Sequence, residues 1–286
     1  MAAESRRFRF VQWEFPGRLG PEPGRYVVRR YAGDDARHVL VIGRLEAPPR
    51  RRLGSRRAQR SEPGAGPTLV EVTRATVIAT DPLPDELRAR EWLAVASRER
   101  SEETVADAMQ LLNLTIHGHR LAAADPYVAE VGVQQAIALR LGYGSGEQVA
   151  EGHWEAAREL APGDRGRRSL ALSPQERLAA LLAGRDVALA CEELALRARL
   201  DLDQGRGREA ALQARAALEA ALAELEGWRG TGDMAARLDE LRGHAAAVEA
   251  AAGAALRGGL EPGEITAVEA ALGRLEAALR ARSAAS

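Results

Sequence analysis

Two hydrophobic stripes near the end of the sequence constrain the fold more than any other feature. The first recurs at alternating spacings of four and three residues: Met234, Leu238, Leu241, Ala245, Val248, Ala252 and Ala255. The second recurs at three and four residues: Ile265, Val268, Leu272, Leu275 and Leu279. A spacing that averages about 3.5 residues places each stripe along one side of a helix. Gly258, Gly259 and Pro262 leave a link so short that the two helices must return antiparallel to each other.

Such a hairpin buries only a narrow stripe, so it should need a third surface. That surface is either the helix pair predicted at residues 186–226 or the same hairpin of a second chain. The larger members of both stripes are therefore candidate residues for helix packing or for a partner interface: Leu238, Leu241, Val248, Ile265, Val268, Leu272, Leu275 and Leu279.

The predicted helix pair upstream carries a family resemblance. Residues 188–222 resemble the turn and second helix of a tetratricopeptide repeat, on the strength of Gly205, Glu209-Ala210 and Ala217-Leu218-Glu219. Gly207 and Ala214 stand where that family typically carries tyrosines, and no further copy is evident at the repeat period. The resemblance implies a helical hairpin and, by analogy with the family, a groove that binds peptides.

Residues 1–80 have the pattern of β-strands. Short runs rich in valine, isoleucine, threonine and aromatic residues alternate with turn signals such as Pro16-Gly17 and Pro23-Gly24. The runs predict four strands in a small antiparallel sheet or an open barrel, near residues 7–15, 25–31, 38–45 and 69–79.

The rest of the chain reads as mostly helical, so we predict an α+β fold with three regions. Residues 81–168 form a mixed helical region with helices from about Pro84 and from Ser101 to about Ala124. A β-hairpin is predicted at 136–150, followed by a short helix from Trp154. Residues 169–286 form an array of helical hairpins that begins at the capping sequence Ser173-Pro174-Gln175-Glu176.

A basic loop at residues 47–67 interrupts the β-region. It has no apolar periodicity, and its six arginines are candidate anion-binding residues: Arg50, Arg51, Arg52, Arg56, Arg57 and Arg60. Residues 1–80 hold 16 arginines against 8 acidic residues, whereas residues 81–286 hold 24 against 33. Three interpretations stay open: the loop binds a polyanion, it folds against the acidic helices of its own chain, or it is simply solvated.

Composition excludes several chemistries. The chain contains no lysine, so Schiff-base catalysis and the lysine-dependent phosphate loops are ruled out. The single cysteine, Cys191, cannot form a disulfide or a cysteine-built metal site within one chain, which favours a reducing cytoplasm. Cys191 lies in an apolar helical run and is predicted to be a buried, unreactive core residue.

Two short motifs resemble functional sites. Gly142-Tyr143-Gly144-Ser145-Gly146-Glu147 lacks the residues that dinucleotide-binding, phosphate-loop and nucleophile-elbow motifs require, so a hairpin turn is the better interpretation. His117-Gly118-His119 could form a metal pair with Asp125 or Glu130. Residues two apart on a helix point in divergent directions, which favours ordinary histidines instead.

The sequence therefore indicates a bacterial-type cytoplasmic protein that holds another protein, or a second copy of itself, on helical surfaces. No arrangement of catalytic residues is evident, so an enzyme is not the favoured interpretation. No cofactor or metal is expected. The alternative is a module that binds nucleic acid or another polyanion through residues 47–67. No apolar run is long enough for insertion into a membrane.

Overall fold

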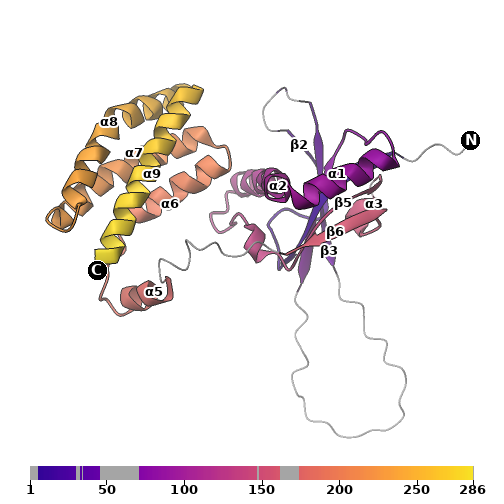
Figure 1. The fold of residues 1–286 in the computed structure, drawn as a ribbon, viewed down its shortest axis with the longest axis horizontal. Helices are drawn as coiled ribbons and strands as arrows, with labels where there is room; N and C mark the ends of the chain where they lie inside the picture. Colours follow the sequence, from indigo (N-terminus) through magenta and orange to yellow (C-terminus); the bar gives the residue numbers. More distant parts are fainter. Residues whose placement is uncertain are drawn as a thin grey trace, which may run out of the picture. The chain divides into compact units, whose positions relative to one another are not determined.

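The computed structural model describes residues 6–29, 33, 35–45, 71–146, 148–161 and 174–285. They belong to two compact units, Met1–Asp164 (unit 1) and Arg165–Ser286 (unit 2), which are drawn in Figure 1. Unit 1 contains a six-stranded sheet with helices, and unit 2 is helical. The α+β fold class is confirmed. The basic loop at residues 47–67 and the capping serine, Ser173, lie outside the described residues.

All the strands that the structure describes in unit 1 join one antiparallel sheet. The strands are β1 (Arg7–Pro16), β2 (Gly24–Val28), β3 (His38–Leu45), β4 (Val72–Ala79), β5 (Ala138–Ser145) and β6 (Ala156–Leu160). Their order in the sheet is β2-β3-β4-β1-β5-β6, and every pairing is antiparallel. The four strands predicted in residues 1–80 are present, and two strands from the following region extend the sheet beyond β1.

Helices α1 (Glu86–Arg98) and α2 (Ser101–Ala123) cover one face of the sheet. Alternate residues of β1 point to this face, and Trp13 is fully buried there among leucines of the sheet and of α2. The other face carries a smaller apolar cluster in which Phe10 and Ile78 pack under Val149 of the short helix α3 (Gln148–Glu151). β1 therefore contributes side chains to two separate cores.

The region around residues 136–160 differs from the prediction. Gly142 and Gly144 lie within strand β5 rather than in a turn, and α3 and β6 follow where a short hairpin and a helix from Trp154 were expected. A Cβ atom on Gly142 would lie 2.5 Å from the Ala156 carbonyl oxygen and 2.6 Å from Cζ of Phe10. These glycines permit close approach of a neighbouring strand and an aromatic ring, which a single sequence does not reveal.

The position of β5 in the sheet also changes how the chain divides into compact units. The sequence suggests three regions that meet near residues 80 and 168, but β5 pairs with β1 through contacts such as Phe10↔Gly142. The middle region therefore completes the sheet that the first region begins, and the two belong to one compact unit.

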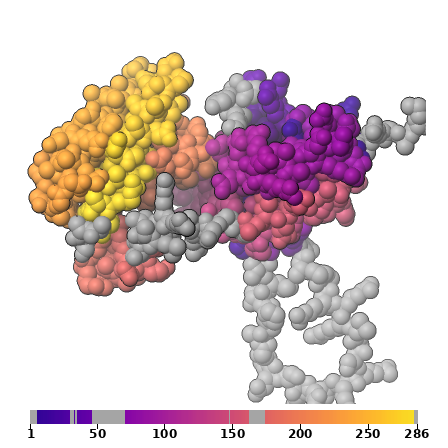
Figure 2. Space-filling model, in the orientation of Figure 1, coloured from indigo at the N-terminus to yellow at the C-terminus, as the bar shows by residue number. Residues whose placement is uncertain are grey.

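Unit 2 consists of five helices and a 3-10 turn within the described residues. They are α5 (Pro174–Leu182), α6 (Ala190–Asp203), α7 (Gly207–Glu224), η2 (Leu225–Trp228), α8 (Met234–Arg257) and α9 (Pro262–Ala285). Figure 2 shows α8 and α9 side by side on the surface of this unit. α7 contacts both of these helices and α6 contacts α9, so the helix pair supplies a third surface to the C-terminal hairpin.

The core of unit 2 is rich in alanine. Fully or nearly fully buried alanines from four helices surround a few leucines, and the set includes Ala195, Ala198, Ala211, Ala214, Ala217, Ala251, Ala255, Ala271 and Ala278. Small side chains let the helices approach closely but bury little area per residue. Among the stripe residues, Leu238, Leu241, Val248, Val268, Leu272 and Leu275 are buried, Leu279 is half-buried and Ile265 is 37% exposed.

Candidate functional site

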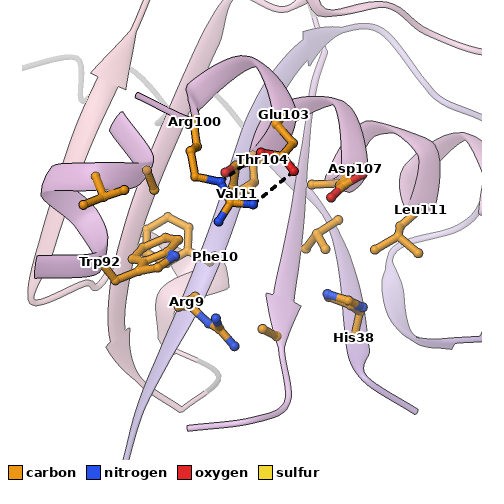
Figure 3. Close-up of a pocket in the computed structure, with 15 residues that line it drawn as sticks. Arg9, Phe10, Val11, His38, Trp92, Arg100, Glu103, Thr104, Asp107 and Leu111 are labelled. Carbon is orange, nitrogen blue, oxygen red and sulfur yellow. Dashed lines mark hydrogen bonds and ion pairs between the residues drawn. The ribbon is translucent and has the colours of Figure 1, made fainter. Parts of the chain in front are cut away.

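A cavity of about 290 Å³ lies in unit 1, between the sheet and the start of α2. Its floor is apolar and is formed by short or branched side chains of β1, β4 and both helices: Val11, Val77, Ala79, Ala96, Ala108 and Leu111. Trp92 of α1 forms one wall, and polar side chains complete the lining (Figure 3). A mixed lining of this kind, with a few polar groups over an apolar floor, is typical of small-molecule sites.

Arg9 enters the cavity from strand β1. It lies on the same face as Val11 and Trp13, because alternate residues of a strand share a face. The carboxylate of Asp81 accepts a hydrogen bond from its Nη2. Its Nε is buried and has no hydrogen-bond partner within the described part of the chain. One end of the cavity is therefore lined by a guanidinium group whose hydrogen-bonding capacity is only partly used.

The first turns of α2 line the opposite side of the cavity. Arg100, the residue before the helix, binds Glu103 through two hydrogen bonds, from Nε at 2.9 Å and from Nη2 at 3.0 Å. This contact uses two of the five N–H donors of Arg100 and engages both carboxylate oxygens of Glu103. Thr104 and Asp107 follow on the same face of the helix, and His38 at the start of β3 completes the lining (Figure 3).

A second polar cluster lies on the other face of the sheet. Glu14 Oε1 accepts hydrogen bonds from Arg140 Nη1 at 2.9 Å and from Arg74 Nη2 at 3.0 Å. Burial alone would raise the pKa of Glu14, but the hydrogen bonds from Arg140 and Arg74 outweigh it and hold this pKa below its usual value. Gln12 is fully buried nearby and donates to Thr76 and to the Val149 carbonyl. These contacts fasten α3 and strand β5 across the sheet.

Unit 2 contains a buried ionic cluster near the end of α9. The side chain of Arg282 is 2% exposed, and its Nη2 donates to Asp186 at 2.6 Å and to the Val187 carbonyl at 3.1 Å. Its guanidinium carbon lies 4.9 Å from the centre of the Trp228 ring. Arg177 of α5 donates to the same aspartate at 3.2 Å. The cluster fixes the segment between α5 and α6 against the end of α9.

Cys191 is buried, as predicted, at the start of α6. Burial and the neighbouring Glu224 carboxylate raise the pKa of its thiol to about 12. The same carboxylate accepts hydrogen bonds from the backbone N–H groups of Ala190, at 3.1 Å, and Cys191, at 3.0 Å. Glu224 of α7 therefore caps α6, and the thiol is held in its neutral, unreactive form at physiological pH.

The histidine pair of α2 is divided between two environments. His117 Nδ1 lies 2.9 Å from Arg120 Nη2 and 3.5 Å from Glu130 Oε1, whereas His119 packs against Gly20. Glu130 also lines a second hollow, of about 600 Å³, beside Phe15. No group of three potential metal ligands occurs anywhere in the residues that the structure describes.

Sequence reasoning missed the cavity residues of unit 1. Arg9, Trp92 and Thr104 come from three separate elements. The sequence around each of them has the alternation of polar and apolar residues that is usual for an amphipathic strand or helix. The alternation of β1 places Arg9 on the face of the buried Trp13, which is the one signal in the sequence that sets it apart. The six predicted anion-binding arginines, Arg50, Arg51, Arg52, Arg56, Arg57 and Arg60, lie outside the described residues.

Comparison with known proteins gives no relative: no protein-family model, curated protein or solved structure matches this chain. Within the described residues, no helix has both the length and the hydropathy that crossing a membrane requires.

Proposed function

We propose that the protein is a non-enzymatic interaction or scaffold protein, and that the helices of unit 2 bind another protein. The observation that carries the proposal is the exposure of large apolar side chains on consecutive turns of α5 and α6. Leu178 and Leu182 of α5 are 48% and 81% exposed, and Leu196 and Leu200 of α6 are 69% and 42% exposed. Residues four apart on a helix are neighbours, so each pair forms a continuous apolar stripe.

A stripe differs from a single exposed leucine, which is normal on any protein surface. Val187, between the two helices, is a further exposed apolar residue, at 63%. Its carbonyl group is held by Arg282, and Asp186 beside it is held by the same arginine. The apolar side chains are therefore presented on backbone that buried ionic contacts keep in place, which lowers the entropic cost of binding a partner.

The partner that fits this surface is a protein with an amphipathic helix. Its apolar side chains would cover the α6 stripe, and its charged side chains would meet the flanking ion pair of Glu193 and Arg197, whose atoms are 2.8 Å apart. The resemblance of residues 188–222 to a tetratricopeptide hairpin supports the same kind of partner. A second copy of the chain could present such a helix too, so self-association belongs to the same test.

The test replaces the α6 stripe by charge and asks whether a partner is lost. The Leu196→Asp/Leu200→Asp double variant and wild type are used to capture proteins from a lysate of the source cells, and light scattering records their mass. Leu87→Asp is the matched control, because Leu87 is 64% exposed on α1 of unit 1. We expect a captured protein, or a dimer, with wild type and Leu87→Asp that the double variant loses. Equal capture by all three would contradict the proposal.

A second candidate function is polyanion binding by residues 47–67. It is supported by the excess of arginine in residues 1–80, where 16 arginines face 8 acidic residues. Binding of this kind weakens steeply as salt rises, because each neutralised phosphate releases a counterion. Deletion of Arg50–Gly66 should flatten the salt dependence of binding to double-stranded DNA. An unchanged slope after the deletion would remove this candidate.

A further inference from the structure

We propose that the cavity of unit 1 binds a small organic acid with an aromatic or branched aliphatic body. The proposal concerns a site in the sheet unit, so it is independent of the partner surface of unit 2. It depends on three features of the cavity: its size and apolar floor, its hydrogen-bond donors that have no partner among the described residues, and carboxylates that already have partners.

Size and lining define the body of the ligand. A volume of about 290 Å³ is at the lower end of the range for ligand pockets, so the occupant is small. Ala96 and Ala108 are small residues where α1 and α2 pack over the sheet, and their short side chains leave the space open. Trp92 offers a flat apolar wall (Figure 3). A single aromatic ring or a branched chain of similar size fits this space and packs well against an indole.

The unused polar groups of the cavity are donors. Asp81 takes one nitrogen of Arg9, and no described residue accepts a hydrogen bond from Arg9 Nη1. The indole N–H of Trp92 and the hydroxyl of Thr104 likewise have no hydrogen-bond partner among the residues that the structure describes. Three donors from three elements thus line one cavity, and the complement of such a set is a group with several acceptor oxygens.

The carboxylates that line the cavity do not oppose this preference for a ligand with acceptor oxygens. Both oxygens of Glu103 accept hydrogen bonds from Arg100, and Asp107 also has an interaction partner. An incoming amine would therefore compete with an existing ion pair, whereas an incoming carboxylate meets donors that are unoccupied. A guanidinium group holds a carboxylate with charge-assisted hydrogen bonds, the stronger kind. A carboxylate on an apolar body is accordingly the ligand class that the lining selects.

The test compares three probes that share one body: 3-phenylpropanoate, 3-phenylpropanamide and 3-phenylpropylamine. Indole N–H signals in an NMR spectrum of the full chain report on binding, and Trp92→Phe identifies the signal of Trp92. We expect the acid to shift that signal saturably, with a Kd of about 1 mM, as suits a fragment of this size. The amide should bind at least about fivefold more weakly, because it loses the charge-assisted contact.

Variants separate ligand binding from folding. Arg9→Gln should weaken the acid about tenfold or more, and Thr104→Val about threefold. Asp81→Asn removes the negative charge that competes with the ligand for Arg9 and should strengthen binding, an effect that a folding defect would not produce. Arg88→Gln, on exposed α1 surface, is the matched control and should bind like wild type.

Three results would overturn the proposal. One is the absence of a saturable shift with the acid at about 10 mM, a concentration well above the expected Kd. Another is tighter binding of the amine than of the acid. The third is an equal loss of binding in Arg9→Gln and Arg88→Gln.

Discussion

Replacement of Leu272 tests the packing of the C-terminal helices most directly. The side chain is 1% exposed on α9 and belongs to the core of unit 2. Leu272→Ala removes three carbon atoms, which at about 0.8 kcal/mol each amounts to roughly 2.4 kcal/mol of lost transfer free energy. A cavity adds to this loss when its surroundings cannot collapse.

The surroundings of Leu272 are poorly suited to collapse. Many other members of its core are alanines, which have no flexible side chain that could move into the space, and they include Ala251, Ala255, Ala271 and Ala278. We therefore expect Leu272→Ala to lower the free energy of unfolding by about 3–5 kcal/mol, the upper part of the range for such substitutions. Leu256→Ala on α8 is the matched control, because Leu256 is 67% exposed, and it should change stability by less than about 0.5 kcal/mol.

Urea unfolding can assign the effect to unit 2. Far-UV circular dichroism follows the helices, whereas three of the four tryptophans, Trp13, Trp92 and Trp154, lie in unit 1. At a slope of about 2 kcal/mol per molar urea, Leu272→Ala should lower the dichroism midpoint by about 2 M and leave the fluorescence midpoint in place. Equal midpoints for Leu272→Ala and Leu256→Ala would refute the assignment. So would a Leu272→Arg variant with unchanged helicity, mass and stability.

Three further outcomes follow from particular contacts. Native-state labelling of Cys191 should be slow and become fast in denaturant, because the thiol is buried with a pKa of about 12; rapid native labelling would contradict this. The pKa of Glu14 is lowered in the fold, so its contribution is fully present above the ordinary carboxyl pKa and is lost as pH falls. Glu14→Gln should therefore cost about 1–2 kcal/mol at pH 7 and little at pH 3 in urea titrations. Gly142→Ala should destabilise by about 1–3 kcal/mol in the same assay, and Gly43→Ala, whose Cβ meets nothing within 4 Å, should not.

The helices of unit 2 were predictable because their signal is local. Spacings of three and four residues identify α8 and α9, and Gly205, at φ +73°, ends the α6 segment as a turn glycine. The details of burial were less predictable. Ala271 and Ala278 are buried although they lie beside the stripe, because α9 contacts α6 and α7 as well as α8. A helix with three neighbours buries a wider arc than a two-helix seam requires.

The second half of the sheet was not predictable in the same way. β6 is short, and its sequence, Ala156–Leu160, has no strong strand preference. Its place is set by pairing with β5, where the glycines admit the backbone of the neighbouring strand. The cavity has a similar origin, since Arg9, Trp92 and Thr104 meet only because of long-range packing. The sequence of a single segment is therefore enough to predict many of the helices and strands, whereas the cavity arises only from tertiary contacts.

The alanine-rich core and the exposed leucines of unit 2 have one physical cause. Ala195, Ala198 and Ala214 occupy the inner faces of α6 and α7, where their small side chains let the two helices approach closely. Two leucines of α6, Leu196 and Leu200, stand on outward positions, whereas Leu194 and Leu202 pack partly buried against the edge of this core. Such a unit gains less apolar burial from its own core than a leucine-packed bundle of the same length. A partner that covered the α6 stripe would supply part of the missing burial, so that binding and folding of unit 2 would stabilise each other.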